Sequence, residues 1–199
     1  AFRYLSRQKD QGREIAEKIA LASQFAQADP YRAATHNKGI FNGIDAILIA
    51  TGNDWRAIES GAHAFASRDG HYQSLSQWTL DLEREELVGQ MTLPMPVATK
   101  GGSIGLNPRV ALSHELLGNP SAKELAQIIV SIGLAQNFAA LKALVSTGIQ
   151  QGHMKLQAKS LALLAGASES EVAPLVERLI ADKTFNLETA QRYLENLRS

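Results

Sequence analysis

The sequence predicts a helix-rich α+β fold that contains one short antiparallel strand pair and ends in a small helical part. Three observations support this prediction. Apolar residues recur at helical spacing, bounded by capping residues, through most of the chain. Residues 72–80 and 86–93 instead alternate between apolar and polar side chains. Glycines near residue 150 precede the last helices, so we expect two parts, residues 1–150 and 151–199.

The first third of the chain predicts helices. Residues 12–28 place apolar side chains at helical spacing. The run 39–50 is apolar and rich in small residues, and its periodicity alone does not separate a buried strand from a buried helix. Thr51 or Asn53 can cap a further helix over Asp54–Ala66. Asp54 would lie in the first turn of this helix, where the helix dipole favours an acidic residue.

The middle of the chain predicts the strand pair. Charged residues between the two alternating stretches indicate an antiparallel connection, and Pro94 ends the second strand. Residues 100–105 are glycine-rich but lack the spacing of a phosphate or dinucleotide loop, which favours a tight turn. Helical signals follow: an Asn107-Pro108 cap, a Ser121–Glu124 capping box with a stop at Gly148, a helix through Met154 to Gly166, a Ser168–Glu171 capping box, and a cap at Asn186.

The composition excludes several classes of function. Twenty basic and twenty acidic residues give no net charge, which makes nucleic acid and anionic membrane poor partners. The absence of cysteine excludes a disulfide framework and fits a cytoplasmic protein. We expect no membrane span, since no fully apolar run approaches about 20 residues. The histidines show no metal-ligand spacing, so we expect no metal. The chain has no initiator methionine, which suggests a longer parent.

Charged residues stand among small and apolar residues between positions 30 and 56. Lys38 and Asp54 are therefore expected to be largely buried, and a buried lysine beside a carboxylate has a tunable pKa suited to proton donation. Structural alternatives exist for each residue. Lys38 is also typical of a helix end, Asp54 of a helix cap, and Arg32 of a surface ion pair.

Three blocks of this sequence are together similar to one enzyme family. They are the run Asp29–Ala66, which includes Gly52-Asn53-Asp54-Trp55-Arg56, then Gly133-Leu134-Ala135-Gln136-Asn137, and Gly148-Ile149-Gln150-Gln151-Gly152-His153-Met154. In order and spacing, the chain resembles the bacterial, soluble class (class II) of 3-hydroxy-3-methylglutaryl-coenzyme A (HMG-CoA) reductase. The resemblance covers nearly all of residues 12–199 and implies that 39–50 is a helix within the larger catalytic domain.

The resemblance also implies roles for individual residues. Lys38 polarises the thioester and then the aldehyde carbonyl, and Asp54 contacts Lys38 and tunes its proton affinity. Asp54 follows Lys38 by sixteen residues. This separation fits a chain that continues from Lys38 as a helix, turns at Gly52 and returns Asp54 to the vicinity of Lys38. His153 lies on a mobile C-terminal flap, residues 151–199, and protonates the departing coenzyme A thiolate.

Four further residues are expected to bind substrate on the same resemblance. Arg32 binds the carboxylate of the hydroxymethylglutaryl group. Asn42, one helical turn after Lys38, belongs to the hydrogen-bond network of that lysine. Gln136 and Asn137 are placed at the substrate site, although buried amides in an apolar helix are also explained as a core hydrogen-bond pair.

Two family motifs are missing from the chain. It lacks the Glu-Asn-Val-Ile-Gly-like motif with a catalytic glutamate and the Asp-Ala-Met-Gly-like motif of the small cofactor domain. We therefore interpret the chain as the C-terminal half of a reductase that uses NADPH or NADH, with the cofactor domain absent. The implied partners are HMG-CoA, mevalonate and coenzyme A, in a homodimer with shared active sites. Alternatives are a non-catalytic helical interaction or dimerisation module, and a different coenzyme A enzyme.

Overall fold

The structure is a computed structural model that describes residue 5 and residues 9–102, 104–146 and 149–198. It divides into two compact units, residues 1–145 (unit 1) and 146–199 (unit 2). Its described helices and one two-stranded sheet give an α+β fold, as the sequence predicts. Unit 1 contains α1 (Lys9–Ala28), α2 (Pro30–Ala50), α3 (Trp55–Ala66), β1 (Ser76–Asp81), β2 (Glu86–Met91), α4 (Pro108–Leu116) and α5 (Ala122–Val145).

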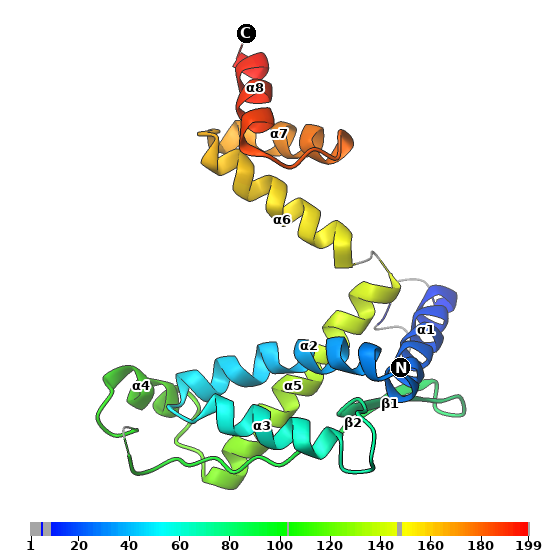
Figure 1. Cartoon of the computed structure of the whole chain (residues 1–199), viewed down its shortest axis with the longest axis vertical. Helices are drawn as coiled ribbons and strands as arrows, with labels where there is room; N and C mark the ends of the chain where they lie inside the picture. Colours follow the sequence, from blue (N-terminus) through cyan, green and yellow to red (C-terminus); the bar gives the residue numbers. More distant parts are fainter. Residues whose placement is uncertain (1–4, 6–8, 103, 147–148, 199) are drawn as a thin grey trace. The chain divides into compact units, whose positions relative to one another are not determined.

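Helices α2 and α5 cross each other at the centre of unit 1 (Figure 1). Two glycines make this close approach possible. A Cβ atom on Gly133 of α5 would lie 2.9 Å from Ile44 of α2, and one on Gly43 of α2 would lie 3.1 Å from Ile132 of α5. The main apolar core of the unit forms around this crossing, from buried side chains such as Ile40, Leu48, Ile58, Leu125 and Ile129.

The sheet is a hairpin whose strands pair antiparallel, with Trp78 opposite Gly89. The Trp78 indole packs in a second apolar cluster with Ile19 of α1 and Leu141 of α5. A Cβ atom on Gly89 would lie 2.5 Å from the indole, so the glycine provides the space for it. The hairpin is thereby held between the first and the fifth helices.

Helix α2 begins at Pro30, nine residues before the predicted start. Asp29 caps it by accepting a hydrogen bond from the Arg32 N–H at 2.7 Å, and proline occupies the first helical position. The apolar run 39–50 therefore marks only the second half of the helix. Lys38 lies in the middle of α2, which corrects its interpretation as a residue at a helix end.

Unit 2 consists of α6 (Ile149–Leu164), α7 (Glu169–Ala181) and α8 (Leu187–Arg198) around an aliphatic core. The predicted caps are confirmed: Ser168 N–H donates to Glu171 at 2.7 Å, and Asn186 accepts from the Thr189 N–H at 2.8 Å. Gly152 lies inside α6, so it is not the linker that we expected. The predicted stop at Gly148 falls outside the described residues.

Helix α5 corrects the expectation that no segment approaches a membrane span. By length and composition alone, α5 is apolar and long enough to cross a membrane. In unit 1 it packs against α2, α1 and β2 and buries Leu125, Ile129, Gly133, Asn137 and Leu141. Part of the apolar surface of α5 is thus buried in contacts within unit 1.

Candidate functional site

The two faces of α2 differ in their surroundings. Ile40 and Ile44 are fully buried, whereas Lys38 and Asn42, one turn apart, are exposed. Among the residues that the structure describes, Lys38 forms no ion pair. The expected burial of Lys38 is therefore wrong. Residues adjacent in sequence point to different sides of a helix, so apolar neighbours did not imply an apolar environment.

Arg32 and Gln136 border the exposed face of α2. Arg32 is half-buried in the first turn of α2, and this burial lowers the pKa of its guanidinium. Gln136 is exposed on α5 beside the helix crossing, since a Cβ atom on Gly43 would lie 3.2 Å from the Gln136 Cβ. Arg32, Lys38 and Asn42 thus lie along α2, and Gln136 of α5 lies beside that helix near Gly43.

The turn after α2 determines the position of Asp54. Gly52 has a φ of +72°, in the left-handed region that glycine adopts without strain. Asn53 then exchanges two hydrogen bonds with the backbone of Ala98, at 2.8 and 3.1 Å. Asp54 itself caps α3 by accepting from the N–H groups of Arg56 and Ala57 at 3.1 and 3.2 Å.

Asp54 does not occupy the buried, first-turn position that we expected. Its side chain is 61% exposed, and the cap is Asp54 rather than Thr51 or Asn53. A cap needs an acceptor at the helix end, where the carboxylate also remains accessible to water. The expected burial of this residue is therefore wrong.

The predicted contact between Asp54 and Lys38 is not present within one chain. Lys38 lies twelve residues before the end of α2, about 18 Å along the helix axis. The Phe41 and His63 rings are 5.3 Å apart, so the C-terminal half of α3 lies beside the turn of α2 that follows Lys38. The N-terminus of α3, which carries Asp54, lies at the opposite end of this helix pair. The carboxylate of Asp54 instead faces Arg56 at 3.8 Å.

Asn137 lies in the core of unit 1, not at its surface. Its side chain is 1% exposed, and its Oδ1 accepts hydrogen bonds from Ser76 Oγ at 2.8 Å and Trp78 Nε1 at 2.7 Å. Its Nδ2 lies 3.0 Å from His36 Nε2. This matches the alternative of a satisfied core amide, and the role of Asn137 at the substrate site stays a prediction.

His153 belongs to α6 in unit 2, whereas the other candidate residues belong to unit 1. Its side chain lies outside the described ones. The role of His153 on a flap therefore stays a prediction.

Sequence reasoning missed two titratable groups on α2. Burial, and then the charge of Arg32, lower the pKa of His36 to about 4. Burial, and then the neighbouring Glu59 carboxylate of α3, raise the pKa of Asp45 to about 6. Asp45 lies seven residues after Lys38 on the same side of α2, a helical spacing that is readable from sequence.

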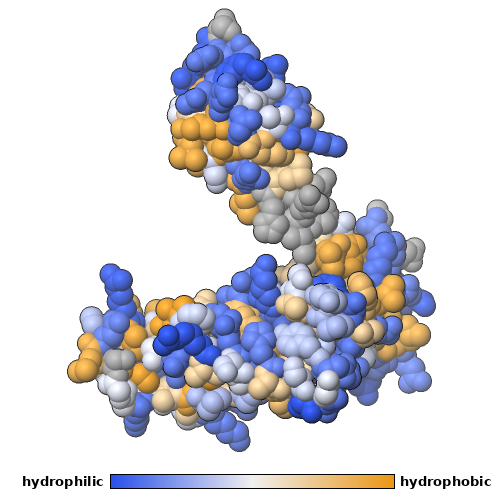
Figure 2. All heavy atoms as spheres, viewed as in Figure 1, coloured by the Kyte–Doolittle hydropathy of each residue, from blue (hydrophilic) through white to orange (hydrophobic). Residues whose placement is uncertain are grey.

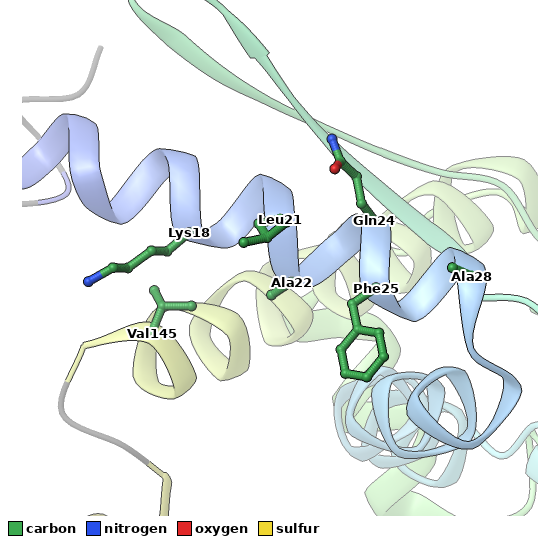
Figure 3. Close-up of a pocket in the computed structure, with 7 residues that line it drawn as sticks. All are labelled: Lys18, Leu21, Ala22, Gln24, Phe25, Ala28 and Val145. Carbon is green, nitrogen blue, oxygen red and sulfur yellow. The ribbon is translucent and has the colours of Figure 1, made fainter.

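Within the described part of the chain, no group of three His, Cys, Asp or Glu side chains is placed to hold a metal ion. A cavity of about 780 Å³ lies elsewhere, along α1 (Figure 3). Its lining is mainly apolar, with Leu21 and Phe25 projecting from α1 and Val145 from the end of α5. None of the predicted site residues whose side chains the structure describes lines this cavity.

Comparisons with known proteins connect these residues to one family. The family profile described as hydroxymethylglutaryl-coenzyme A reductase matches residues 2–158. A protein of Archaeoglobus fulgidus described as 3-hydroxy-3-methylglutaryl-coenzyme A reductase is 50% identical over 188 residues, which cover 94% of this chain and 43% of that protein. A second relative, from Borreliella burgdorferi and described as a probable reductase of this kind, is 42% identical over 80% of this chain and 37% of its own length.

Solved structures give the same assignment. A 3-hydroxy-3-methylglutaryl-coenzyme A reductase from Streptococcus pneumoniae is 95% identical with a TM-score of 0.74, over 99% of this chain and 47% of that one. A class II enzyme from the same organism, bound to NADPH in open conformations, is 95% identical with a TM-score of 0.73, over 100% of this chain and 48% of that one. The chain spans about half the length of the relatives that it matches.

Proposed function

Because the chain belongs to the hydroxymethylglutaryl-coenzyme A reductase family, we propose that an enzyme carrying it reduces HMG-CoA to mevalonate and coenzyme A with NADPH or NADH, in the cytoplasm. The supporting observation is the set of Arg32, Lys38 and Asn42 on one helix, with Gln136 beside it. Such a set provides two cations and two amides to an anionic, carbonyl-containing substrate.

Each of these residues has a chemical role in the proposal. The Lys38 ammonium donates to the thioester oxygen, and later to the aldehyde oxygen, and stabilises the negative charge that develops there. Asn42, one helical turn away, supports the Lys38 side chain and the substrate hydroxyl. Arg32 binds the carboxylate of the substrate, since a guanidinium offers two parallel N–H donors. Gln136 hydrogen-bonds the bound acyl group.

Asp54 acts in this proposal across a homodimer with shared active sites. Within one chain it is too far from Lys38, yet both side chains are exposed and available to a second copy. Large apolar side chains are exposed on the helices that meet near Gly52, and Figure 2 shows apolar surface at the end of unit 1 where α4 lies. They are Ile49, Trp55, Leu112 and Leu116. An exposed patch of this kind is typical of a subunit interface.

His153 is proposed as the general acid for the coenzyme A thiolate. Its position on a helix of unit 2, a compact unit separate from the one that carries Lys38, is compatible with a flap that delivers the acid. A neutral-range pKa suits a group that protonates a thiolate once per turnover.

In the part of the chain that the structure describes, neither the turn at 100–105 nor the cavity along α1 by itself fits a nicotinamide dinucleotide. The turn at 100–105 lacks a dinucleotide fingerprint, and the cavity along α1 offers mainly apolar side chains with Lys18 as its cation. We therefore assign cofactor binding to the part of a full-length enzyme that this chain does not contain, and we expect no turnover from the 199 residues alone. The chain is also missing the catalytic glutamate motif.

The direct test is Lys38→Ala in a full-length enzyme that carries these residues. We expect kcat to fall about 10²–10³-fold, as for removal of one preorganised donor to a developing oxyanion. Folding should be unchanged, because Lys38 is exposed and forms no ion pair among the described residues. Lys123→Ala, another exposed lysine of unit 1 that forms no ion pair among the described residues, is the matched control. Near-normal turnover of Lys38→Ala would contradict the assignment.

A further inference from the structure

A buried polar network joins α2, α5 and β1 on the buried side of α2. His36 of α2 is 3% exposed, and Asn137 and Ser76 are each 1% exposed. The His36 Nε2 lies 2.6 Å from Ser76 Oγ and 3.0 Å from Asn137 Nδ2. Trp78 Nε1 reaches Asn137 Oδ1 at 2.7 Å, so one amide contacts three partners.

The chemistry of the partners determines where the protons lie. An indole N–H only donates, so the Asn137 atom that faces Trp78 is the carbonyl oxygen. The Ser76 hydroxyl donates its single proton to that same Asn137 oxygen, so the His36 Nε2, 2.6 Å from Ser76 Oγ, is the donor to Ser76. His36 is consequently neutral with its proton on Nε2, and its Nδ1 is buried without a hydrogen-bond partner. These donor and acceptor roles are assigned from the hydrogen-bond network.

The hydrogen bonds that run from His36 through the Ser76 hydroxyl to Asn137 are a polar link between the two helices that carry the proposed substrate residues. Arg32 precedes His36 by one turn on α2, and Gln136 precedes Asn137 on α5. Close contacts at Gly43 and Gly133 determine how near the helices lie, but apolar packing alone permits small shifts along the crossing. A directional hydrogen bond restricts that freedom, since it weakens steeply with misalignment.

We propose that His36 and Asn137 are positioning residues, whose buried hydrogen bonds through Ser76 hold Arg32 and Gln136 in the mutual register that binds the hydroxymethylglutaryl group. This inference rests on the proposed function. Neither side chain touches substrate, and both act through their neighbours. Because Arg32 and Gln136 are proposed to bind the part of the substrate that does not react, loss of register should weaken binding more than it slows the chemistry.

The test is a pair of substitutions in a full-length enzyme that carries these residues. His36→Leu removes the donor to the Ser76 hydroxyl, whereas His36→Gln offers a side-chain N–H donor near the place of Nε2. We expect His36→Leu to raise KM for HMG-CoA about tenfold with kcat changed less than about threefold, and His36→Gln to restore most of KM. If His36→Leu does not fold, His36→Asn takes its place, since its shorter amide does not reach Ser76.

Two controls separate the possible outcomes. Ile40→Ala, one turn further along the buried face of α2, destabilises the same helix without touching the network. If Ile40→Ala raises KM as much as His36→Leu does, or if His36→Gln is no better than His36→Leu, the positioning role is wrong. Arg32→Ala tests the proposed function separately. An unchanged KM in Arg32→Ala would reject the substrate role of Arg32, whereas a raised KM in Arg32→Ala with a normal KM in His36→Leu would reject only the positioning pair.

Discussion

The two units of the chain stabilise their interiors by different means. Unit 1 buries polar side chains with specific partners, among them His36, Asn37, Asn137, Ser23, Ser76, Thr51 and His114. In the described part of unit 2 the buried set is aliphatic apart from Thr189. The ion pair between Arg198 and Glu171 of unit 2, at 2.8 Å, lies at the surface of that unit.

This difference indicates what each unit is built to do. Buried hydrogen bonds specify one arrangement of neighbouring elements, because a group left without its partner is costly. Apolar contacts stabilise a small helical bundle with less demand for one exact register. The proposed substrate residues of α2 and α5 belong to the unit that has the buried polar contacts.

The largest expected effect comes from the aliphatic core of unit 2. Leu179 is fully buried, and Leu179→Ala should lower the free energy of unfolding of this unit by about 2–5 kcal/mol. Both tryptophans, Trp55 and Trp78, belong to unit 1, so circular dichroism should show an earlier helical transition while tryptophan fluorescence is unchanged. Leu164→Ala, at a position that is 71% exposed, is the control. An equal shift of the fluorescence transition would show that the two units unfold together.

Acid should weaken unit 1 through His36. The pKa of His36 is about 4 in the folded chain against 6.5 ordinarily, so between these values the unfolded chain binds a proton that the folded chain does not. Its contribution is fully present above pH 6.5 and is lost as the pH falls through about 4, by about 3 kcal/mol. Urea unfolding followed by tryptophan fluorescence from pH 7 to 4 measures this loss.

Asp45 opposes that trend, since its raised pKa of about 6 means that the folded chain binds the extra proton between the ordinary value of 3.8 and about 6. Asp45→Asn should therefore steepen the acid-induced loss of unit 1 stability, and His36→Gln should remove most of that loss.

In unit 2 the hydrogen bond from Arg198 is the main cause that lowers the pKa of Glu171 to about 2. The contribution of Glu171 to the stability of unit 2 is present above pH 4.5 and is lost as the pH falls from 4.5 through about 2. A uniform acid loss in both units would contradict this comparison.

A smaller effect is expected from the amide that anchors the unit 1 network. Asn137→Leu leaves the Trp78 N–H and the Ser76 hydroxyl without their acceptor in the core, which should cost about 2 kcal/mol. The neighbouring Gln136→Leu changes an exposed amide and should leave stability nearly unchanged. Urea unfolding followed by tryptophan fluorescence measures the stability of both variants. Equal losses of stability in Asn137→Leu and Gln136→Leu would show that the buried network does not make Asn137 more important for stability than Gln136.

The smallest expected effect separates two roles of Asp54. Asp54→Ala removes the cap of α3 and should cost about 1 kcal/mol, whereas Asp54→Asn keeps an acceptor and should retain most of that stability. Reductase activity of a full-length enzyme should fall in both variants, because each removes the carboxylate. Full activity in Asp54→Asn would mean that Asp54 acts only as a cap.

Local features of the fold followed from the sequence alone. The capping residues Asn107, Ser121, Ser168 and Asn186 open helices where we expected them, because a cap depends on side chains only a few residues away. The strand pair followed from alternation for the same local reason. Three short blocks sufficed to identify the family, and the exposed candidates Lys38, Asn42 and Gln136 were among their residues.

Burial and contact were decided only by the tertiary structure. Lys38 and Asp54 are exposed, whereas His36 and Asn137 are buried. All four of these polar residues nevertheless have small or apolar neighbours in the sequence. The side of α2 that faces solvent depends on where α5 crosses it, and that crossing depends on Gly43 and Gly133, ninety residues apart in sequence. The distance between Lys38 and Asp54 likewise depends on the direction of α3 after Gly52. Sequence determined the local elements, and long-range packing determined which side chains share an environment.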